Sequence, residues 1–267
     1  MPELPEVKSI QDQLNKIMPF EIKSWQKSPV SDSIIHTKTD GLKGKTVLNV
    51  SRKGKMLDFI LSDGRHLLSH LGMTGTWLIS KEKILEKHTH LQFKGQKYFL
   101  AYVDPRRFGH MYLYDENLAQ KKLSELGLDL LDKKFTLEYF QSSLKKYPHR
   151  AIKVSLLDQS LFAGTGNYIA NEICAHGRVL PTRLVKTLSP TEMKQLYQGI
   201  FKVLKPTINS GGTTFAGGYR DTTGNKGNGV NHLVVFYQKT CQICTKTPVI
   251  KILLAQRGTY YCPKCQK

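Results

Sequence analysis

The sequence has no long apolar run, few acidic residues and only five cysteines. No stretch approaches the roughly 20 apolar residues that a membrane-spanning helix needs. Its start, MPELPEV, is acidic and contains two prolines, unlike the basic and apolar start of a signal peptide. We therefore expect no membrane span and a cytosolic location.

Positive charge is abundant: 40 Lys and Arg face 21 Asp and Glu, for a formal net charge of +19. These cations are scattered through patterned sequence instead of forming a tail, and hydrophobic residues make up 40%, which is enough for a packed core. A folded domain with a basic face suits nucleic acid better than a membrane anchor. The length of 267 residues allows one large domain or two ordinary ones.

Apolar spacing predicts the organisation of the chain. A helix is expected over 7–18, where apolar residues recur at helical intervals after Pro5. Short β-rich segments follow, with turn candidates at 62–65 and 94–97, and they favour an antiparallel sandwich or barrel. These segments are 45–52, 55–61, 66–72, 75–80, 90–93, 97–103 and 110–114.

The second half of the chain has the apolar spacing of helices instead of strands. Helical spacing recurs over 136–147, 152–159, 167–177 and 190–208. A glycine-rich polar segment, 215–229, then predicts a flexible loop, and LVVFYQ (233–238) predicts a return to strand. We expect a β-rich domain over 1–131, a helical domain over 132–235 and a cysteine module over 236–267.

Four cysteines form two C-x2-C pairs near the C-terminus: Cys241, Cys244, Cys262 and Cys265. This spacing is typical of a four-thiolate zinc site with a hairpin between the pairs, and the filled shell predicts a structural metal. Disulfides are the alternative, disfavoured in a cytosol. Arg257 lies near the expected hairpin tip, where it is either functional or a solvated turn arginine. Cys174 is expected to be a buried thiol.

Three further motifs leave alternatives open. AGTGNYIANE (163–172) places glycines before a helix, which suits either a phosphate site with Asn167 or a tight helix corner. HLGMTG and DPRRFG mix apolar and cationic loop residues. A core role would explain Met73 or Phe108 singly, whereas apolar wedges flanked by an arginine such as Arg106 are typical of proteins that enter a DNA duplex. Lys55 alone reads as solvated. His88 and His90 in KHTH are expected to alternate along a strand, so at most one of them faces a given ligand.

The N-terminus also has two readings. Pro5 suits a first helical turn, and Glu3 and Glu6 suit the positive end of its dipole. Alternatively, removal of Met1 would leave Pro2 with a secondary amine of pKa about 8, which is nucleophilic near neutrality.

Together these blocks resemble the formamidopyrimidine-DNA glycosylase/endonuclease VIII family, and most closely its formamidopyrimidine-DNA glycosylase branch. The resemblance runs from PELPEV through RKGKM, HLGMTG, KHTH, DPRRFG, GTGNYIANE and GGTT to CPKCQK. It implies an α+β fold: an N-terminal antiparallel β-sandwich with an N-terminal helix, then a helix-two-turn-helix domain with a four-cysteine zinc-finger hairpin. It also implies a base-excision repair enzyme of a bacterial-type cytosol, with one structural zinc ion. The sequence itself gives no sign of an oligomer, so we expect a monomer.

The resemblance assigns the reaction to the N-terminal residues. Pro2 would be the nucleophile that forms a Schiff base with the sugar, and Glu3 the general acid/base supported by Glu6. Lys55 would contact phosphate and assist elimination, and Arg257 would aid the second elimination. The implied substrates are 8-oxoguanine and formamidopyrimidines in duplex DNA.

The resemblance also implies a DNA interface. Met73, Arg106 and Phe108 would fill the gap left by the extruded base, His88 and Asn167 would bind phosphate, and segment 215–229 would close over the base. One alternative is an endonuclease VIII-like enzyme for oxidised pyrimidines, against which the Arg-x-Phe pair of DPRRFG argues. Another is a non-catalytic zinc protein that binds DNA, although Pro2, Glu3 and Lys55 are all present.

Overall fold

The structure, a computed structural model, describes residues 2–216 and 218–267 and divides the chain into two units. The first comprises the chain up to Glu125 together with Ser210–Asn228, and the second comprises Leu126–Asn209 with Gly229–Lys267. The three consecutive domains expected from the sequence stay a prediction. Across the described ranges, each helix is too short or too polar to cross a membrane.

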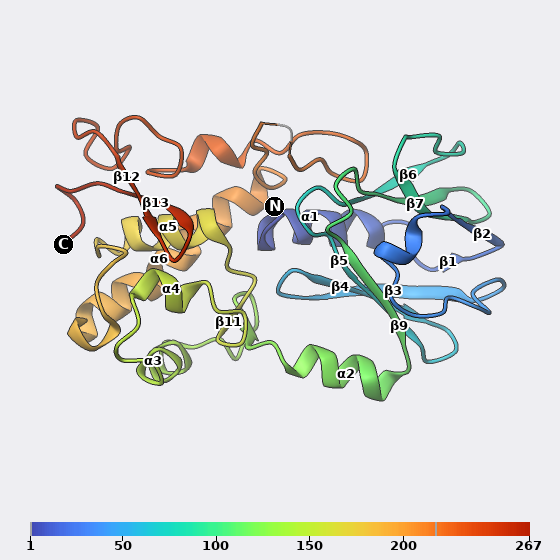
Figure 1. Ribbon diagram of the computed structural model, residues 1–267, viewed down its shortest axis with the longest axis horizontal. Helices are drawn as coiled ribbons and strands as arrows, with labels where there is room; N and C mark the ends of the chain where they lie inside the picture. Colours follow the sequence, from blue (N-terminus) through green and yellow to red (C-terminus); the bar gives the residue numbers. More distant parts are fainter. Residues whose placement is uncertain (1, 217) are drawn as a thin grey trace. The chain divides into compact units, whose positions relative to one another are not determined.

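The first unit is an antiparallel β-sandwich with helix α1, Leu4–Asn15, which packs against β3, β4 and β6 (Figure 1). One sheet has the order β1 (Phe20–Glu21), β3 (Thr46–Lys53), β4 (Met56–Leu61), β5 (His66–His70), β9 (His110–Tyr114). The other has the order β2 (Ser24–Lys27), β7 (Thr89–Lys94), β8 (Phe99–Val103), β6 (Thr76–Ser80). The expected sandwich is confirmed, and both expected turns join paired strands, β4 with β5 and β7 with β8. A 3-10 turn, η1 (Ser31–Ser33), and helix α2 (Glu116–Ser124) complete the unit.

Helix α1 begins before the expected residue because its first turn is capped by its own acids. Glu3 is the N-cap, and Glu3 and Glu6 form a capping box in which each side chain accepts from the other's backbone N–H. Pro5 lies in the first turn, as expected. The apolar face of the helix, with Val7, Ile10 and Leu14, is fully buried.

The core of the sandwich is centred on Trp77. Its ring lies 4.8 Å from Phe59, 5.5 Å from Tyr102 and 6.1 Å from Phe93, measured between ring centroids. The indole Nε1 donates to Ser69 Oγ at 3.0 Å, which satisfies the only polar atom of this fully buried side chain.

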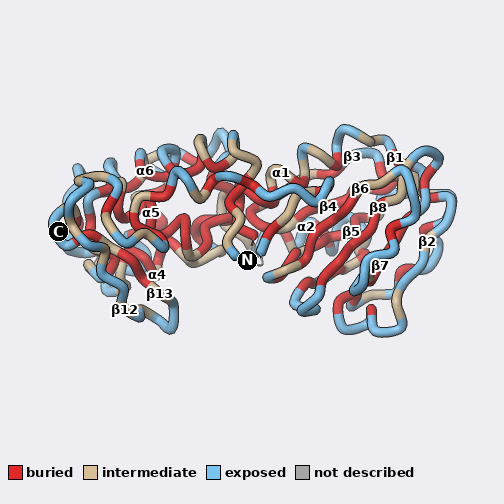
Figure 2. The backbone as a smooth tube through the Cα atoms, turned by 90° about the horizontal axis from the view of Figure 1, so that it is seen from above, coloured by how far each residue is buried: buried red, intermediate tan, exposed pale blue. Residues whose placement is uncertain are grey.

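The second unit is mainly helical. It contains α3 (Leu137–Lys145), α4 (Ile152–Leu156), α5 (Asn167–His176) and α6 (Pro190–Asn209), the 3-10 turns η2 (Val185–Thr187) and η3 (Gly229–His232), the short parallel pair β10 (Leu128–Asp129) and β11 (Phe162–Ala163), and the hairpin β12 (Ile250–Leu254) and β13 (Arg257–Tyr261). Helix α5 is buried along most of its length (Figure 2). Cys174 on α5 is buried as expected, and burial raises the pKa of its thiol to about 12.

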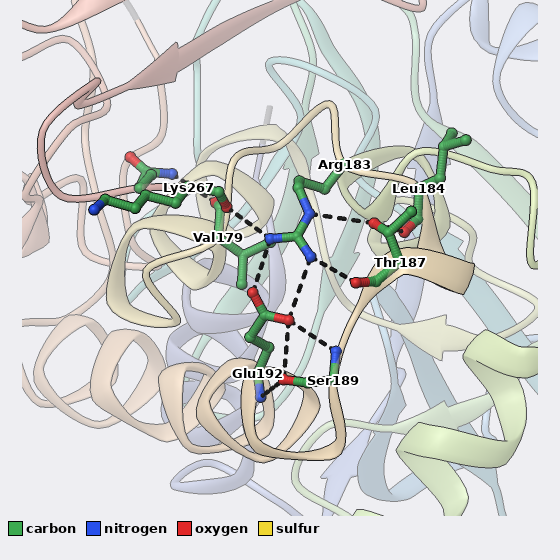
Figure 3. A network of polar contacts seen from close by, with 8 residues as sticks. Val179, Arg183, Leu184, Thr187, Ser189, Glu192 and Lys267 are labelled. Carbon is green, nitrogen blue, oxygen red and sulfur yellow. Dashed lines mark hydrogen bonds and ion pairs between the residues drawn. The ribbon is translucent and has the colours of Figure 1, made fainter.

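A polar network fastens the start of α6 (Figure 3). Arg183 Nη1 donates to Glu192 Oε1 at 2.8 Å and to the backbone oxygen of Lys267 at 3.1 Å. Glu192 Oε2 accepts from the N–H of Ser189 at 2.8 Å, and Ser189 Oγ accepts from the N–H of Glu192 at 3.2 Å. The capping box of Ser189 and Glu192 stabilises the start of the helix, and Arg183 links Glu192 to the backbone of Lys267.

The structure corrects two local expectations. Residues 233–238, expected as a strand, lie outside every strand, because the N–H groups of Val234, Val235 and Phe236 donate to the buried carboxylate of Glu172 at 2.7–2.9 Å. Burial raises the pKa of Glu172 to about 7, although these three donors lower it. His88, expected in a strand with His90, lies before β7 at a φ of 68°.

We expect Trp77→Ala to lower the free energy of unfolding by about 3–5 kcal/mol, the cost of emptying a buried aromatic site. Urea unfolding followed by circular dichroism measures this. The control is Leu85→Ala, where the side chain is 83% exposed and the change should stay within about 0.5 kcal/mol. A loss below about 1 kcal/mol at Trp77 would contradict the described core.

Candidate active site and nucleic-acid interface

Pro2 and Glu3 are buried at the start of α1, and Glu3 is only 3% exposed. The N–H of Glu3 donates to Glu6 Oε2 at 2.7 Å, so the backbone next to Pro2 is held by a carboxylate. Both readings of the N-terminus are compatible with this geometry, because the helix cap also positions the candidate nucleophile. Met1 lies outside the described residues, and its removal stays a prediction.

Glu6 links this terminus to the GGTT motif. Its second oxygen, Oε1, accepts from the N–H of Thr213 at 2.6 Å. Gly212 has a φ of 88°, and a Cβ there would lie 3.0 Å from Glu6 Cγ and 3.1 Å from Glu6 Cα. Glycine is therefore needed both for its backbone conformation and for the close approach to α1.

Lys55 follows Gly54 in the turn between β3 and β4 and is 8% exposed, so the reading as a solvated lysine is wrong. It lies beside His70, whose cross-strand partners are Met56 and His110. Burial, and after it the charges of Lys55 and His110, lower the pKa of His70 to about 4. Lys55 is thus a buried cation beside a histidine whose charged form is disfavoured, and such a cation suits an anionic ligand such as phosphate.

The HLGMTG and DPRRFG loops pack directly on each other and expose the residues that the sequence singled out. Met73 is 39% and Phe108 47% exposed, which excludes the core reading for both. The guanidinium of Arg106 lies 4.7 Å from the ring of Phe108. Gly72 has a φ of 63°, and a Cβ there would lie 2.3 Å from the carbonyl of Phe108, so a larger residue would separate the loops.

Asp104 holds these loops in place and was missed by the sequence reasoning. This fully buried carboxylate accepts from Thr74 Oγ1 at 2.6 Å and from the N–H groups of Gly109 at 2.8 Å and Arg106 at 3.3 Å. Its own backbone oxygen is 3.0 Å from Nε2 of the buried His90, whereas His88 is exposed. An aspartate before proline at a strand end was the available signal.

The second unit brings Asn167 to the hairpin that carries Arg257. Lys153, which is fully buried and was also missed, donates from Nζ to Asn167 Oδ1 at 2.9 Å and to Thr259 Oγ1 at 2.8 Å. Asn167 Nδ2 donates to the backbone oxygen of Gly258 at 3.1 Å. Arg257, the neighbour of Gly258, is exposed at the start of β13. Asn167 and the hairpin therefore form one polar assembly within this unit.

The four paired cysteines converge at the base of the same hairpin. Their sulfur atoms all lie within 4.8 Å of one another, with Cys241 Sγ 4.0 Å from Cys265 Sγ and Cys244 Sγ 3.8 Å from Cys262 Sγ. These separations are far longer than a disulfide bond and close to the ~3.8 Å between thiolates that share a tetrahedral zinc at about 2.3 Å. The donor set therefore fits a metal ion.

An N-terminal β-sandwich with a capped helix, a helical unit and a four-cysteine hairpin together define a DNA-repair glycosylase. The model of the formamidopyrimidine-DNA glycosylase N-terminal domain matches residues 1–111, and that of the formamidopyrimidine-DNA glycosylase H2TH domain matches residues 126–217. The formamidopyrimidine-DNA glycosylase of Listeria monocytogenes is 36% identical, with all of both chains covered.

Solved structures agree over the whole chain. The crystal structure of the MutM (Fpg) protein from Thermus thermophilus matches with a TM-score of 0.88 at 31% identity, covering 99% of this chain and 98% of that one. Lactococcus lactis Fpg in complex with DNA containing N7-benzyl-Fapy-dG matches with a TM-score of 0.89 at 30% identity, covering both chains fully. The chain belongs to the formamidopyrimidine-DNA glycosylase family.

We expect His70 to titrate near pH 4 in the protein without DNA, as measured by NMR of its ring protons. Because the pKa is lowered on folding, the unfolded chain takes up a proton between pH 6.5 and 4 that the folded chain does not, so the free energy of unfolding falls as the pH falls through this window.

His70→Asn, whose side-chain oxygen can still accept from the N–H of Gly72, should flatten this pH dependence. The exposed His88→Asn is the control and should leave it unchanged. A titration of His70 near pH 6.5 would contradict the burial of its ring beside the Lys55 cation.

Proposed function

We propose that this chain is a bifunctional DNA glycosylase and AP lyase that removes 8-oxoguanine and formamidopyrimidines from duplex DNA through a Schiff base on Pro2. The observation that carries this is the capped N-terminus, in which the carboxylate of Glu6 holds the N–H of the buried Glu3, the residue next to Pro2. Family membership and the DNA-bound Lactococcus lactis relative support the substrate class.

In this mechanism the amine of Pro2 attacks C1′ of the damaged nucleotide, and the bond from C1′ to the base breaks. Glu3 moves protons at the leaving base and at O4′ of the sugar, so that the C1′–O4′ bond opens to a hydroxyl and the bond from C1′ to the Pro2 nitrogen becomes an iminium. The iminium of a secondary amine carries a positive charge without further protonation, so it draws electrons from the sugar and acidifies the proton at C2′. Loss of that proton expels the 3′ phosphate, and a second elimination expels the 5′ phosphate.

The other residues hold the DNA. Four residues would contact phosphate groups of the DNA backbone: Lys55, His88, Asn167 and Arg257. The net charge of +19 on the chain favours binding to this polyanion. Arg106 would pair with the base left opposite the lesion, while Met73 and Phe108 hold the stack open. Their exposure in two mutually packed loops supports this role.

We also propose that one zinc ion is held by Cys241, Cys244, Cys262 and Cys265. Four thiolates leave no open position for a catalytic water, so the metal would hold the hairpin fold and support DNA binding. A monomer in the bacterial cytosol, associated with DNA, stays the expectation from the sequence.

Borohydride should trap a stable adduct between the protein and DNA that contains 8-oxoguanine, and peptide mapping should place it on Pro2. Glu3→Gln should keep DNA binding but lose base excision, because proton transfer is lost while the shape is nearly unchanged. An adduct on Lys55, or none with any oxidised base, would contradict the mechanism.

Cys244→Ser should lose the metal, measured by mass spectrometry of the purified protein, and weaken DNA binding at fixed salt. Cys174→Ala is the matched control, since it removes a cysteine outside the cluster and should retain one metal per chain. Undiminished lesion cleavage by a metal-free preparation would count against the proposed role.

A further inference from the structure

Two exposed histidines meet at the edge of the first sheet, which ends in β9. His36 Nε2 lies 2.8 Å from His110 Nδ1, and the two ring centroids are 5.0 Å apart. His36 comes from the segment after η1, and His110 is the first residue of β9, directly after the DPRRFG loop. The two histidines are 74 positions apart in the chain, so no local motif pointed to the pair.

Backbone hydrogen bonds fix the two segments that carry these rings. The N–H of His36 donates to the backbone oxygen of Met111 at 3.0 Å, and the N–H of Met111 donates to that of Ile34 at 2.7 Å. Ile35 and Met111 form a parallel bridge, and the side chains of both are buried in the core of the sandwich. The histidines therefore extend from backbone that is held on both sides of the pair.

Packing also restricts the orientation of the His36 ring. Its centroid lies 5.1 Å from that of Tyr112, which in turn stacks on Tyr114 at 5.4 Å. A side chain that is already ordered loses little further freedom when it binds a ligand. Because both histidines are exposed, water can satisfy their ring nitrogens, so burial does not require the hydrogen bond between them.

The separation of the two nitrogens matches that of two adjacent ligands on one metal ion. Imidazole nitrogen binds a metal at about 2.0–2.1 Å, so two such ligands lie about 2.9 Å apart at a right angle and about 3.4 Å apart at a tetrahedral angle. The observed 2.8 Å is close to the right-angle separation. Tetragonal coordination by nitrogen is typical of Cu²⁺ and Ni²⁺, whereas structural Zn²⁺ sites are tetrahedral.

We propose that His36 and His110 form a binding site for a divalent transition-metal ion that takes nitrogen ligands at a right angle, Cu²⁺ or Ni²⁺. His36 Nε2 and His110 Nδ1 would be the two protein ligands, and water or an anion would fill the other positions. The ring that donates in the present pair would move its proton to its other nitrogen through water. Both facing nitrogens then offer a lone pair, and the neutral pair releases no net proton.

This site differs from the four-cysteine cluster in its ligands and in its place. The histidine pair belongs to the first unit and the cysteines to the second. Thiolates suit Zn²⁺, whereas imidazoles without thiolates leave Cu²⁺ and Ni²⁺ competitive. The inference does not depend on the proposed function, because neither histidine has a role in that mechanism.

The probe is Ni²⁺ bound to nitrilotriacetate, a chelator that leaves only two adjacent positions of the ion open. Such a probe cannot accept four thiolates, so the cysteine cluster does not compete for it. Isothermal titration calorimetry at about pH 8, where imidazole is mostly neutral, should show one site per chain. His36→Ala and His110→Ala should each weaken binding at least about tenfold, because one imidazole alone loses the gain from binding through two.

His149→Ala is the matched control, since it removes an exposed histidine of the second unit and should bind the probe like the parent. NMR locates the bound ion. His70 is the cross-strand partner of His110, so the paramagnetic Ni²⁺ should broaden the ring-proton signals of His70 in the parent and not in His110→Ala. Far-UV circular dichroism checks that the single variants, both at exposed positions, keep the parental fold.

Each outcome decides the proposal. One bound probe per chain, lost in both single variants and kept in His149→Ala, supports it. A parent that binds no probe would overturn it, as would a folded His36→Ala or His110→Ala variant that binds with parental affinity. An equal loss in His149→Ala would also overturn it, because the probe would then be held by scattered surface histidines.

Discussion

The carboxylate of Glu6 is the contact on which the candidate active site depends. One oxygen holds the N–H of Glu3 and the other that of Thr213, so a single side chain fixes the end of α1 and the GGTT turn against each other. Glu6 is 1% exposed, and an ionised carboxylate at such depth is tolerated only when donors replace the water it has lost. The same requirement explains why Gly212, which lets the backbone approach, lies opposite it.

The same arrangement recurs at two other buried acids. Asp104 accepts from backbone N–H groups of the DPRRFG loop, and Glu172 accepts from three consecutive N–H groups at 234–236. Backbone donors in an irregular segment need acceptors when they are buried, and a carboxylate can serve several at once. In a chain of +19 formal charge, these few acids order irregular segments, and the excess of positive charge suits a polyanionic partner.

In the second unit a buried cation, Lys153, plays the equivalent part, because it donates to acceptors of segments that are distant in the chain. Its ammonium group donates hydrogen bonds to Asn167, Gly258 and Thr259, and these bonds join the start of α5 to the hairpin. The cysteine cluster closes the base of the same hairpin. The exposed Arg257 therefore projects from a support fixed by both polar contacts and the thiolate cluster.

Features that depend on local spacing were determined by the sequence alone. The short β-rich segments and the two C-x2-C pairs act over a few residues, so their patterns predicted the sandwich and the thiolate cluster. The first helix was also predicted, but its start at Leu4 lies before the predicted residue 7. The motifs also identified the family, and they singled out Arg106 and Phe108, which the structure places at the surface. Their individual roles stay predictions.

Contacts between distant segments were decided only by the tertiary structure. LVVFYQ has strand propensity, yet its N–H groups are taken by Glu172, more than 60 positions earlier. The glycine-rich segment looked flexible, yet Gln13 anchors it from the first helix. A side chain's hydrogen-bond partner depends on which backbone groups the fold leaves unpaired nearby, and no local pattern of residues encodes that.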